Sequence, residues 1–371
     1  MPCQLARPRG RCSAIWRPTT NPHVSAPANC RHWHDTDRHE GYSAVTLLRL
    51  HKVKRTYSTR QGLFGETEQV SAVNGVSLSL ERGRTVGLVG ESGCGKSTTG
   101  RLALGIELPD SGDVTFDGTR LPHPNTKAWK ALRRRMQLIF QDPLGALDRR
   151  LTIGAQIKEP LAIHKIGSPA DHEGQVHRLL AAVGMRPDQA ASYPHELSGG
   201  QRQRAILARA LATSPDILVC DEPVSALDVS IQAQVVNLLL DLQKEFGLAM
   251  LFISHDLKLV GCLAHEVAVM YLGLIVEQGE PATLYNEPAH PYTKALLAAV
   301  PDSTRRGPRP LLSGEPPNPA ARPTGCAFHP RCPIAVPKCS QVEPALLPRA
   351  DGRLVACHLA HVESAAGEKV S

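Results

Sequence analysis

The chain has 371 residues, a formal net charge of +7, 42% apolar residues and 4% aromatic residues. This length allows one large domain with extensions or two domains, and the charge is too mild to indicate nucleic acid as the main partner. The longest apolar run, Val267–Val276, is far shorter than the ~20 residues of a membrane-spanning helix, so we expect a buried strand there and no transmembrane segment.

Two changes in composition divide the chain. Residues 1–42 are rich in Pro, Arg and His and lack the hydrophobic segment of a signal peptide, so we predict a disordered N-terminal extension. Alternating apolar segments begin at about residue 43 and give way to Pro, Arg and Gly after residue 300. We therefore predict one domain over residues 43–300 and, over residues 301–371, a Pro-rich linker with a cysteine-bearing tail.

Apolar periodicity within residues 43–300 predicts an α/β fold. Short apolar segments have the pattern of strands, and two longer segments have the period of helices. Strands are expected at Val76–Leu80, Thr85–Val89, Met136–Phe140, Ile217–Cys220 and Ala249–Ile253, and helices at Gln201–Ala212 and Ser230–Phe246. Strands separated by helices indicate a mainly parallel sheet with helices on both faces. A smaller helical subdomain is expected at about residues 143–212.

A glycine-rich loop, Gly90-Glu-Ser-Gly-Cys-Gly-Lys-Ser97, follows the second of these strands and opens a helix. The sequence is a complete P-loop, in which glycines let backbone N–H groups converge on a phosphate beside a helix N-terminus. Lys96 is expected to reach the β- and γ-phosphates of ATP, and Ser97 to bind Mg²⁺. The expected ATP contacts are Gly90, Glu91, Ser92, Gly93, Cys94, Gly95, Lys96, Ser97 and Thr98.

Two acids, Asp221 and Glu222, end the apolar strand that begins at Ile217. Ligands of open α/β sheets collect at the carboxyl edge, where this strand delivers both side chains. Asp221 is expected to hold Mg²⁺ through water, and Glu222 to orient and polarise the attacking water. A surface pair of acids is the alternative, and it fits poorly at the end of a buried strand.

The segment Leu197-Ser-Gly-Gly-Gln201 precedes a long helix. Taken alone, it is compatible with an ordinary N-cap turn in which Ser198 is the cap. The order of motifs along the chain is more specific: the P-loop, Gln141, Leu197–Gln201, Asp221-Glu222, Ser225-Ala-Leu-Asp228 and His255. With this order the chain resembles the ABC ATPases over roughly Val45–Pro301, and the LSGGQ signature is specific to that superfamily.

The resemblance implies a P-loop NTPase fold with a parallel sheet core, an antiparallel β subdomain and a helical subdomain. It also implies a head-to-tail pair of subunits, in which ATP on one P-loop meets the signature of the other, formed by Leu197, Ser198, Gly199, Gly200 and Gln201. Further implied roles are adenine stacking by Tyr57, a dimer-interface position for Asp228, and contacts of Gln141 and His255 with the γ-phosphate region. Glu222, His255 and Gln141 are then the catalytic residues, and Ser97, Gln141 and Asp221 bind Mg²⁺.

Segments that flank these motifs resemble a narrower family, the dipeptide and oligopeptide permeases, which includes nickel and glutathione importers. They are Phe140-Gln-Asp-Pro143, Tyr193–Gly200, His290–Leu297 and Gly325–Cys332, and they look most like the second ATP-binding subunit of a dipeptide permease. One departure is Asp148-Arg-Arg150, where members usually have an Asn-Pro-Arg-like turn. The resemblance implies a peripheral ATPase on the cytoplasmic face of the membrane that couples hydrolysis to uptake of di- or oligopeptides. The implied partners are two transmembrane permease subunits, a paralogous ATP-binding subunit and an extracytoplasmic substrate-binding protein, without nucleic acid.

Other functions remain open at this point. A soluble ABC ATPase of translation or DNA repair is the main alternative, but such translation factors carry two cassettes and such repair proteins insert long coiled coils. This sequence has one cassette and no heptads between its P-loop and its signature. An importer of nickel or glutathione is also left open, because specificity lies in other subunits.

Four cysteines, Cys326, Cys332, Cys339 and Cys357, lie in the tail. Their spacing differs from the paired CxxC of a zinc ribbon. The permease ATPases that the chain resembles carry a [4Fe–4S] cluster on a comparable set, which implies an iron–sulfur cluster here. A zinc ion and four unliganded thiols are the alternatives. We expect the tail to be separate from the P-loop, so that changes at these cysteines leave ATP binding intact.

Overall fold

The computed structural model describes the chain over residues 46–60, 67–225, 227–299 and 317–360. The expected disordered extension, residues 1–42, and most of the Pro-rich linker lie outside these ranges. Within them, no helix combines the length and the apolar character that crossing a bilayer requires.

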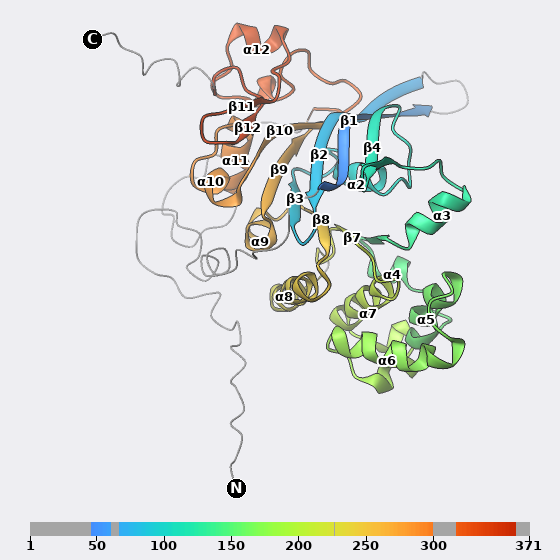
Figure 1. Ribbon diagram of the computed structural model, residues 1–371. Coiled ribbons are helices and arrows are strands. Elements are labelled where there is room, and N and C mark those ends of the chain that lie inside the picture. Colours follow the sequence, from blue (N-terminus) through green and yellow to red (C-terminus); the bar gives the residue numbers. More distant parts are fainter. Residues whose placement is uncertain (1–45, 61–66, 226, 300–316, 361–371) are drawn as a thin grey trace, which may run out of the picture.

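An eight-stranded sheet forms the centre of the structure, with the order β11-β12-β10-β9-β3-β8-β7-β6 (Figure 1). Its strands are β3 (Thr85–Val89), β6 (Met136–Ile139), β7 (Ile217–Asp221), β8 (Ala249–Ser254), β9 (Glu266–Tyr271), β10 (Leu274–Gly279), β11 (Leu347–Pro348) and β12 (Leu354–Val355). The strands from β6 to β9 pair in parallel, and β10, β12 and β11 continue the sheet antiparallel. The predicted α/β fold with a mainly parallel sheet is confirmed.

A second, antiparallel sheet covers one side of the helix that follows the glycine-rich loop. Its order is β2-β1-β4-β5, from β1 (Thr46–Arg60), β2 (Thr67–Glu81), β4 (Ser111–Phe116) and β5 (Thr119–Arg120). The helix α2 (Lys96–Ala103) contacts this sheet and also β7 and β8 of the main sheet. Leu102 of α2 therefore shares a core with Leu48 of β1 and Leu251 of β8. The expected antiparallel β subdomain is present.

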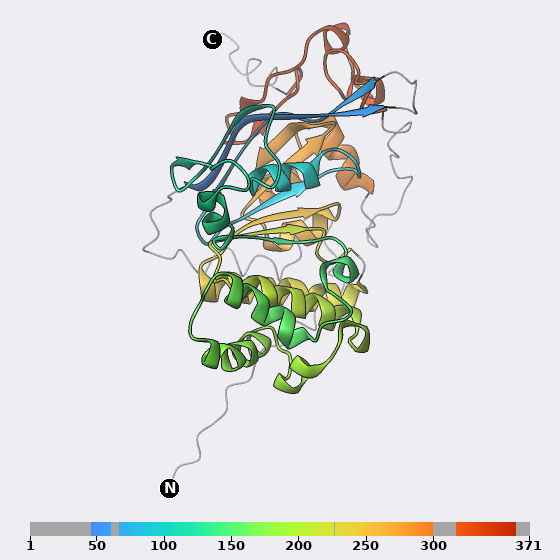
Figure 2. The same ribbon diagram turned by 90° about the vertical axis from the view of Figure 1, so that its right-hand side faces the viewer.

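Helices cover the main sheet and form a lobe next to its β6–β7 edge (Figures 1 and 2). In the described part of the chain, α2 is joined by the helices α3 (Lys127–Arg133), α4 (Pro143–Ala146), α5 (Ile153–Ile163), α6 (His172–Ala182), α7 (Gly199–Leu211), α8 (Val229–Phe246), α9 (Leu257–Leu263), α10 (Pro281–Asn286), α11 (Pro291–Ala299) and α12 (Pro337–Gln341). Short 3-10 turns are η1 (Pro169–Asp171), η2 (Pro187–Ala191), η3 (Pro194–Glu196) and η4 (His329–Arg331). The helices α5, α6 and α7 pack on one another within the range expected for a helical subdomain.

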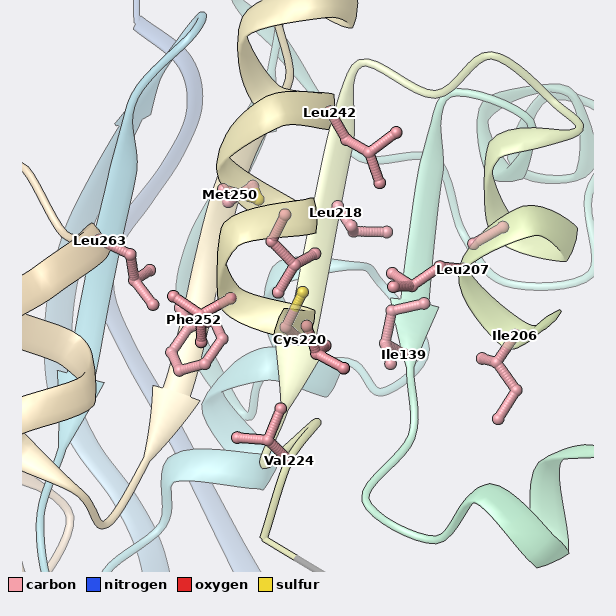
Figure 3. Packing of buried hydrophobic residues seen from close by; sticks show 14 of the residues in the cluster. Ile139, Ile206, Leu207, Leu218, Cys220, Val224, Leu242, Met250, Phe252 and Leu263 are labelled. Carbon is pink, nitrogen blue, oxygen red and sulfur yellow. The ribbon is translucent and has the colours of Figure 1, made fainter. Parts of the chain in front are cut away.

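Apolar side chains fill the space between the main sheet and its helices (Figure 3). Leu218 of β7 and Phe252 of β8 lie in the same core as Leu207 of α7 and Leu242 of α8, and all four are fully buried or nearly so. Every residue of β7 and β8 is buried, as expected for central parallel strands covered on both faces. In these two strands the polar side chains, Asp221 and Ser254, are the last residues, at the edge where the site forms.

The apolar run Val267–Val276 is not one strand, and the sequence-based prediction is wrong here. It forms the hairpin of β9 and β10, with Leu274 paired to Tyr271. The two turn residues, Leu272 and Gly273, have φ of 43° and 81°, which is the left-handed geometry that joins antiparallel strands tightly. A leucine in that turn extends the apolar run and hides the reversal.

The cysteine-bearing tail is not separate from the main sheet. Its strand β12 pairs with β10, which places Val355 opposite Glu277. Ala327 and Phe328 belong to the main hydrophobic core. The tail therefore completes the sheet beyond β10 (Figure 1), and the expectation of an independent tail is wrong in this respect.

Candidate nucleotide site

The glycine-rich loop lies between β3 and α2, at the centre of the main sheet. Gly95 precedes the helix with φ of 106°, and a Cβ atom there would lie 2.0 Å from the carbonyl oxygen of Ala72. Only glycine fits both this conformation and this close approach. Because no side chain caps the start of α2, its first amides are available to an anion.

Lys96 is buried, with 4% of its surface exposed. Its ammonium donates to the carbonyl oxygens of Gly90 and Glu91 at 2.9 Å each, so it lies across the loop. Cys94 is buried as well, and burial raises the pKa of its thiol. Cys94 therefore packs inside the loop, while Ser92 and Gly93 are exposed at its rim, and phosphate contact by Lys96 stays a prediction.

A hydroxyl and a carboxylate meet beside the loop. The Ser97 hydroxyl donates to Asp221 Oδ1 at 2.9 Å, which joins the start of α2 to the end of β7. Burial raises the pKa of Asp221, while the bond from Ser97 opposes this effect. Hydroxyl and carboxylate oxygens are ligands that Mg²⁺ prefers, so the two side chains fit the metal expected of a P-loop site.

Glu222 contacts the two side chains that are predicted to act with it in catalysis. Gln141 donates to Glu222 Oε2 at 3.1 Å, and Nδ1 of His255 lies 3.4 Å from the same oxygen. The backbone of Glu222 is left-handed, with φ of 45°, and its N–H donates to the carbonyl oxygen of Ile253 at 2.9 Å. This strained conformation aims the carboxylate away from the strand and toward Gln141 and His255.

Comparisons with known proteins identify the family. Residues 73–225 match the family described as ABC transporter. The chain is 48% identical over 320 residues to the oligopeptide transport ATP-binding protein AppF of Bacillus subtilis (strain 168), covering 85% of this chain and 97% of that protein. The chain belongs to the ABC transporter family. It is also 46% identical over 313 residues to the dipeptide transport ATP-binding protein DppF of Escherichia coli (strain K12), with coverage of 84% and 93%.

Solved structures of ABC transporter components have the same fold. The cbiO1 protein of Clostridium perfringens, part of the ABC transporter complex cbiONQ, superposes with a TM-score of 0.57 at 26% identity, covering 65% of this chain and 91% of that one. The dimeric, post-hydrolysis ATP-binding cassette MJ0796, bound to ADP and Pi, gives a TM-score of 0.56 at 26% identity, covering 63% and 99%. The second family match, to the C-terminal region of oligopeptide/dipeptide transporters, spans residues 276–339.

The ABC signature lies apart from the P-loop group, at the start of α7 in the helical lobe (Figure 1). The Ser198 hydroxyl caps this helix by accepting from the backbone N–H of Gln201 at 3.3 Å. In return, the Gln201 side-chain oxygen accepts from the backbone N–H of Ser198 at 2.9 Å. Leu197 is buried, and a Cβ atom at Gly200 would lie 2.7 Å from Ile231. The cap and the signature are therefore the same feature, and the assignment of Leu197–Gln201 to a second subunit's ATP stays a prediction.

Two further predicted residues lie at the periphery. Tyr57 is half-buried in β1, where its hydroxyl donates to Glu107 and the guanidinium carbon of Arg55 lies 5.1 Å from the ring centroid. Asp228 begins α8 without a side-chain cap. Adenine stacking by Tyr57 and a dimer-interface role for Asp228 stay predictions.

The four tail cysteines line one small cavity together with Phe328 and His329. Burial, reinforced by the neighbouring cysteines, raises the pKa of the Cys326 thiol to about 11. Across the described residues, no three His, Cys, Asp or Glu side chains are drawn together closely enough to hold a single metal ion. The cysteines thus share one cavity without converging on one point.

Sequence reasoning missed two residues that touch the P-loop from the C-terminal part of the chain. The Tyr292 hydroxyl accepts from the N–H of Glu91 at 2.9 Å, and Arg331 forms an ion pair with the Glu91 carboxylate at 2.9 Å. Both residues lie in segments singled out by the resemblance, His290–Leu297 and Gly325–Cys332. The resemblance of these segments to the permease family was the sequence signal for them, although it did not indicate that they contact Glu91.

Proposed function

We propose that this chain is the ATP-hydrolysing subunit of an importer that takes up di- or oligopeptides, peripheral to the cytoplasmic face of the membrane. The observation that carries the proposal is the convergence of Gln141 and His255 on Glu222, next to the Ser97–Asp221 pair. The peptide substrate is supported by the relatives named for oligopeptide and dipeptide transport and by the match over residues 276–339.

Hydrolysis follows from the placement of these groups. Lys96 exchanges its carbonyl contacts for phosphate oxygens, and the uncapped amides of α2 bind the same anion. Ser97 and Asp221 would hold Mg²⁺, which supplies charge neutralisation on the phosphoryl group. Glu222 orients a water molecule and accepts its proton, while Gln141 and His255 fix the carboxylate and the water.

In this function, a second ATP-binding subunit completes the nucleotide site, and the permease subunits follow the movement of the ATP-binding subunits. In the proposal, Ser198 and Gly200 contact ATP on a paralogous ATP-binding subunit, and release of the γ-phosphate opens the pair. An open groove of about 640 Å³ is lined by Gly145–Leu151 with Gln156, Glu159 and Arg209. Exposed Leu151 lies in this groove and exposed Phe140 directly precedes Gln141, so we assign the groove to a helix of a transmembrane permease subunit. Asp148 and Arg150, the departure from the family pattern, form an ion pair in it.

Reconstitution tests this function. The purified chain should hydrolyse ATP poorly, and assembly in vesicles with its permease subunits, paralogous ATPase and binding protein should give ATP-dependent peptide uptake. Nickel and glutathione, supplied in place of peptide, test the alternative cargoes. Robust hydrolysis by the isolated chain that permease subunits leave unchanged would favour a soluble ATPase instead.

We also propose that Cys326, Cys332, Cys339 and Cys357 hold a [4Fe–4S] cluster. Their placement around one cavity supports the proposal, since four cysteine sulfurs are the usual ligands of such a cluster. The raised pKa of Cys326 means that the thiol is protonated without a metal, and iron would displace that proton. The cluster would then fasten a segment too small to form a core of its own.

Anaerobic purification tests the cluster. The protein should be brown, with visible absorption that bleaches on reduction and with near-stoichiometric iron and sulfide. Replacement of any one of the four cysteines by serine should remove most of the colour. Colourless protein that contains one zinc ion, without iron or sulfide, would favour the zinc alternative.

A further inference from the structure

Glu91, the residue after the first glycine of the P-loop, is held at all three of its polar groups. Its N–H donates to the Tyr292 hydroxyl at 2.9 Å, and its carbonyl oxygen accepts from Lys96 at 2.9 Å. Its carboxylate receives two hydrogen bonds from Arg331, at 2.9 and 3.1 Å. Side chains of both the cassette and the tail therefore hold the P-loop in place at Glu91.

Arg331 is suited to this contact because its own position is fixed. Its side chain is only 5% exposed, and its guanidinium also donates to the Tyr271 hydroxyl at 3.4 Å. Tyr271, Tyr292 and Phe328 pack as a cluster of rings with centroids 4.6 to 5.4 Å apart. This cluster joins the β9–β10 hairpin, α11 and the tail directly behind Glu91.

The charge of Glu91 explains why such a partner is needed. A carboxylate in a loop that binds a triphosphate repels the ligand unless a cation neutralises it. A bidentate guanidinium both neutralises the carboxylate and fixes its direction. Tyr292 cannot supply this effect, because its hydroxyl accepts from the backbone N–H of Glu91 and carries no positive charge.

We infer that Arg331 is a positioning residue for ATP, through which the cysteine-bearing tail sets the affinity of the P-loop. The inference rests on the proposed function, because it takes Gly90–Thr98 to be the nucleotide site. Arg331 acts through Glu91 and not by touching the nucleotide. Its effect therefore falls on ATP binding and not on the hydrolytic step at Glu222.

Nucleotide titration of the full-length chain tests the inference. Arg331→Ala should raise the Kd for MgATP about tenfold, which corresponds to a repulsion of about 1.4 kcal/mol between the uncompensated Glu91 carboxylate and the phosphates. Arg331→Lys should fall between this variant and the wild type, because it keeps the charge and loses the fork. The double variant Arg331→Ala/Glu91→Gln should return to within about threefold of the wild type, because it removes the unpaired carboxylate.

The controls separate positioning from general damage. Arg322→Ala breaks another ion pair of the tail, with the exposed Glu343, and should leave the Kd unchanged. In the assembled transporter, Arg331→Ala should raise the KM for ATP and spare kcat, which is the signature of lost uniform binding.

Three results would overturn the inference. One is an unchanged Kd in Arg331→Ala. Another is a loss of affinity that Glu91→Gln fails to reverse, since this would indicate structural damage. A wild-type chain that does not bind MgATP at all would overturn the proposed function as well, and that outcome is distinct from the first two.

Discussion

The tail is clamped to the main sheet by a buried ion pair. Arg353 Nη1 lies 3.2 Å from Glu277 Oε1 in β10, and the two side chains are 3% and 0% exposed. The Glu277 carboxylate also accepts from the backbone N–H groups of Ala289 and His290 at 2.9 Å each. Arg353 further donates to Asp351 at 2.6 Å. This clamp lies next to β12, the strand that extends the sheet.

Arg353→Met should destabilise the protein because it strands a buried carboxylate. Removing one partner of a buried pair costs about 3–5 kcal/mol. Since two backbone bonds to Glu277 remain, we expect the lower end, about 3 kcal/mol. With a urea slope of about 3 kcal/mol per molar for a chain of this size, the unfolding midpoint should fall by about 1 M.

Urea unfolding followed by circular dichroism measures this effect. The double variant Arg353→Met/Glu277→Gln should recover most of the loss, because a neutral amide is far less costly to bury than an unpaired charge. Arg322→Ala, which removes a partly exposed pair, should shift the midpoint by less than about 0.3 M. A midpoint in Arg353→Met that matches this control would refute the reasoning, since Glu277 would then be compensated without Arg353.

Three further predictions concern the site, the tail and pH. Glu222→Gln should keep MgATP binding and lower hydrolysis in the assembled transporter by about 10²–10⁴-fold, whereas Lys96→Ala should weaken binding itself; wild-type turnover in Glu222→Gln would exclude its role as base. Cys332→Ser should raise the Kd for MgATP several-fold, because Cys332 adjoins Arg331. The control Cys262→Ser, at an exposed position of α9, should leave the Kd unchanged. Equal Kd values for Cys332→Ser and the wild type would show that the tail holds Arg331 without this cysteine. Burial lowers the pKa of His290 to about 3, so between this pH and about 6.5 the unfolded chain binds more protons than the folded chain. The free energy of unfolding should therefore decrease by about 2 kcal/mol from pH 7 to pH 5. In His290→Asn the denaturant midpoint should depend less on pH across this range. A pH dependence equal to that of the wild type would exclude His290 as the cause.

Local patterns were sufficient for the parts of the fold in which burial and sequence coincide. The strands β3, β7 and β8 are buried on both faces, so their apolar runs indicate their positions to within a residue. The acids that end β7 follow from the same reasoning, because a buried strand must deliver polar groups at its edge. The β9–β10 hairpin could not be predicted in this way, because its turn contains Leu272, a residue type that is not typical of turns.

The placement of the tail could not be read from local patterns at all. Its strands, β11 and β12, have two residues each, too few for a period to appear. The pair of Arg331 and Glu91 joins residues 240 positions apart, and neither residue type indicates its partner. Composition therefore marked residue 300 as a boundary, although packing continues across it.

The change in composition at residue 300 does not separate the tail from the cassette in the folded structure. The tail follows a Pro-rich segment of the sequence, yet it pairs with β10 and neutralises a charge in the P-loop. Glu91 and Glu277 are acids of the cassette whose cationic partners, Arg331 and Arg353, both come from the tail. A cassette without that tail would retain every nucleotide motif and yet present two carboxylates that lack their cationic partners, one of them in the P-loop. Charge as well as packing therefore joins the tail to the P-loop.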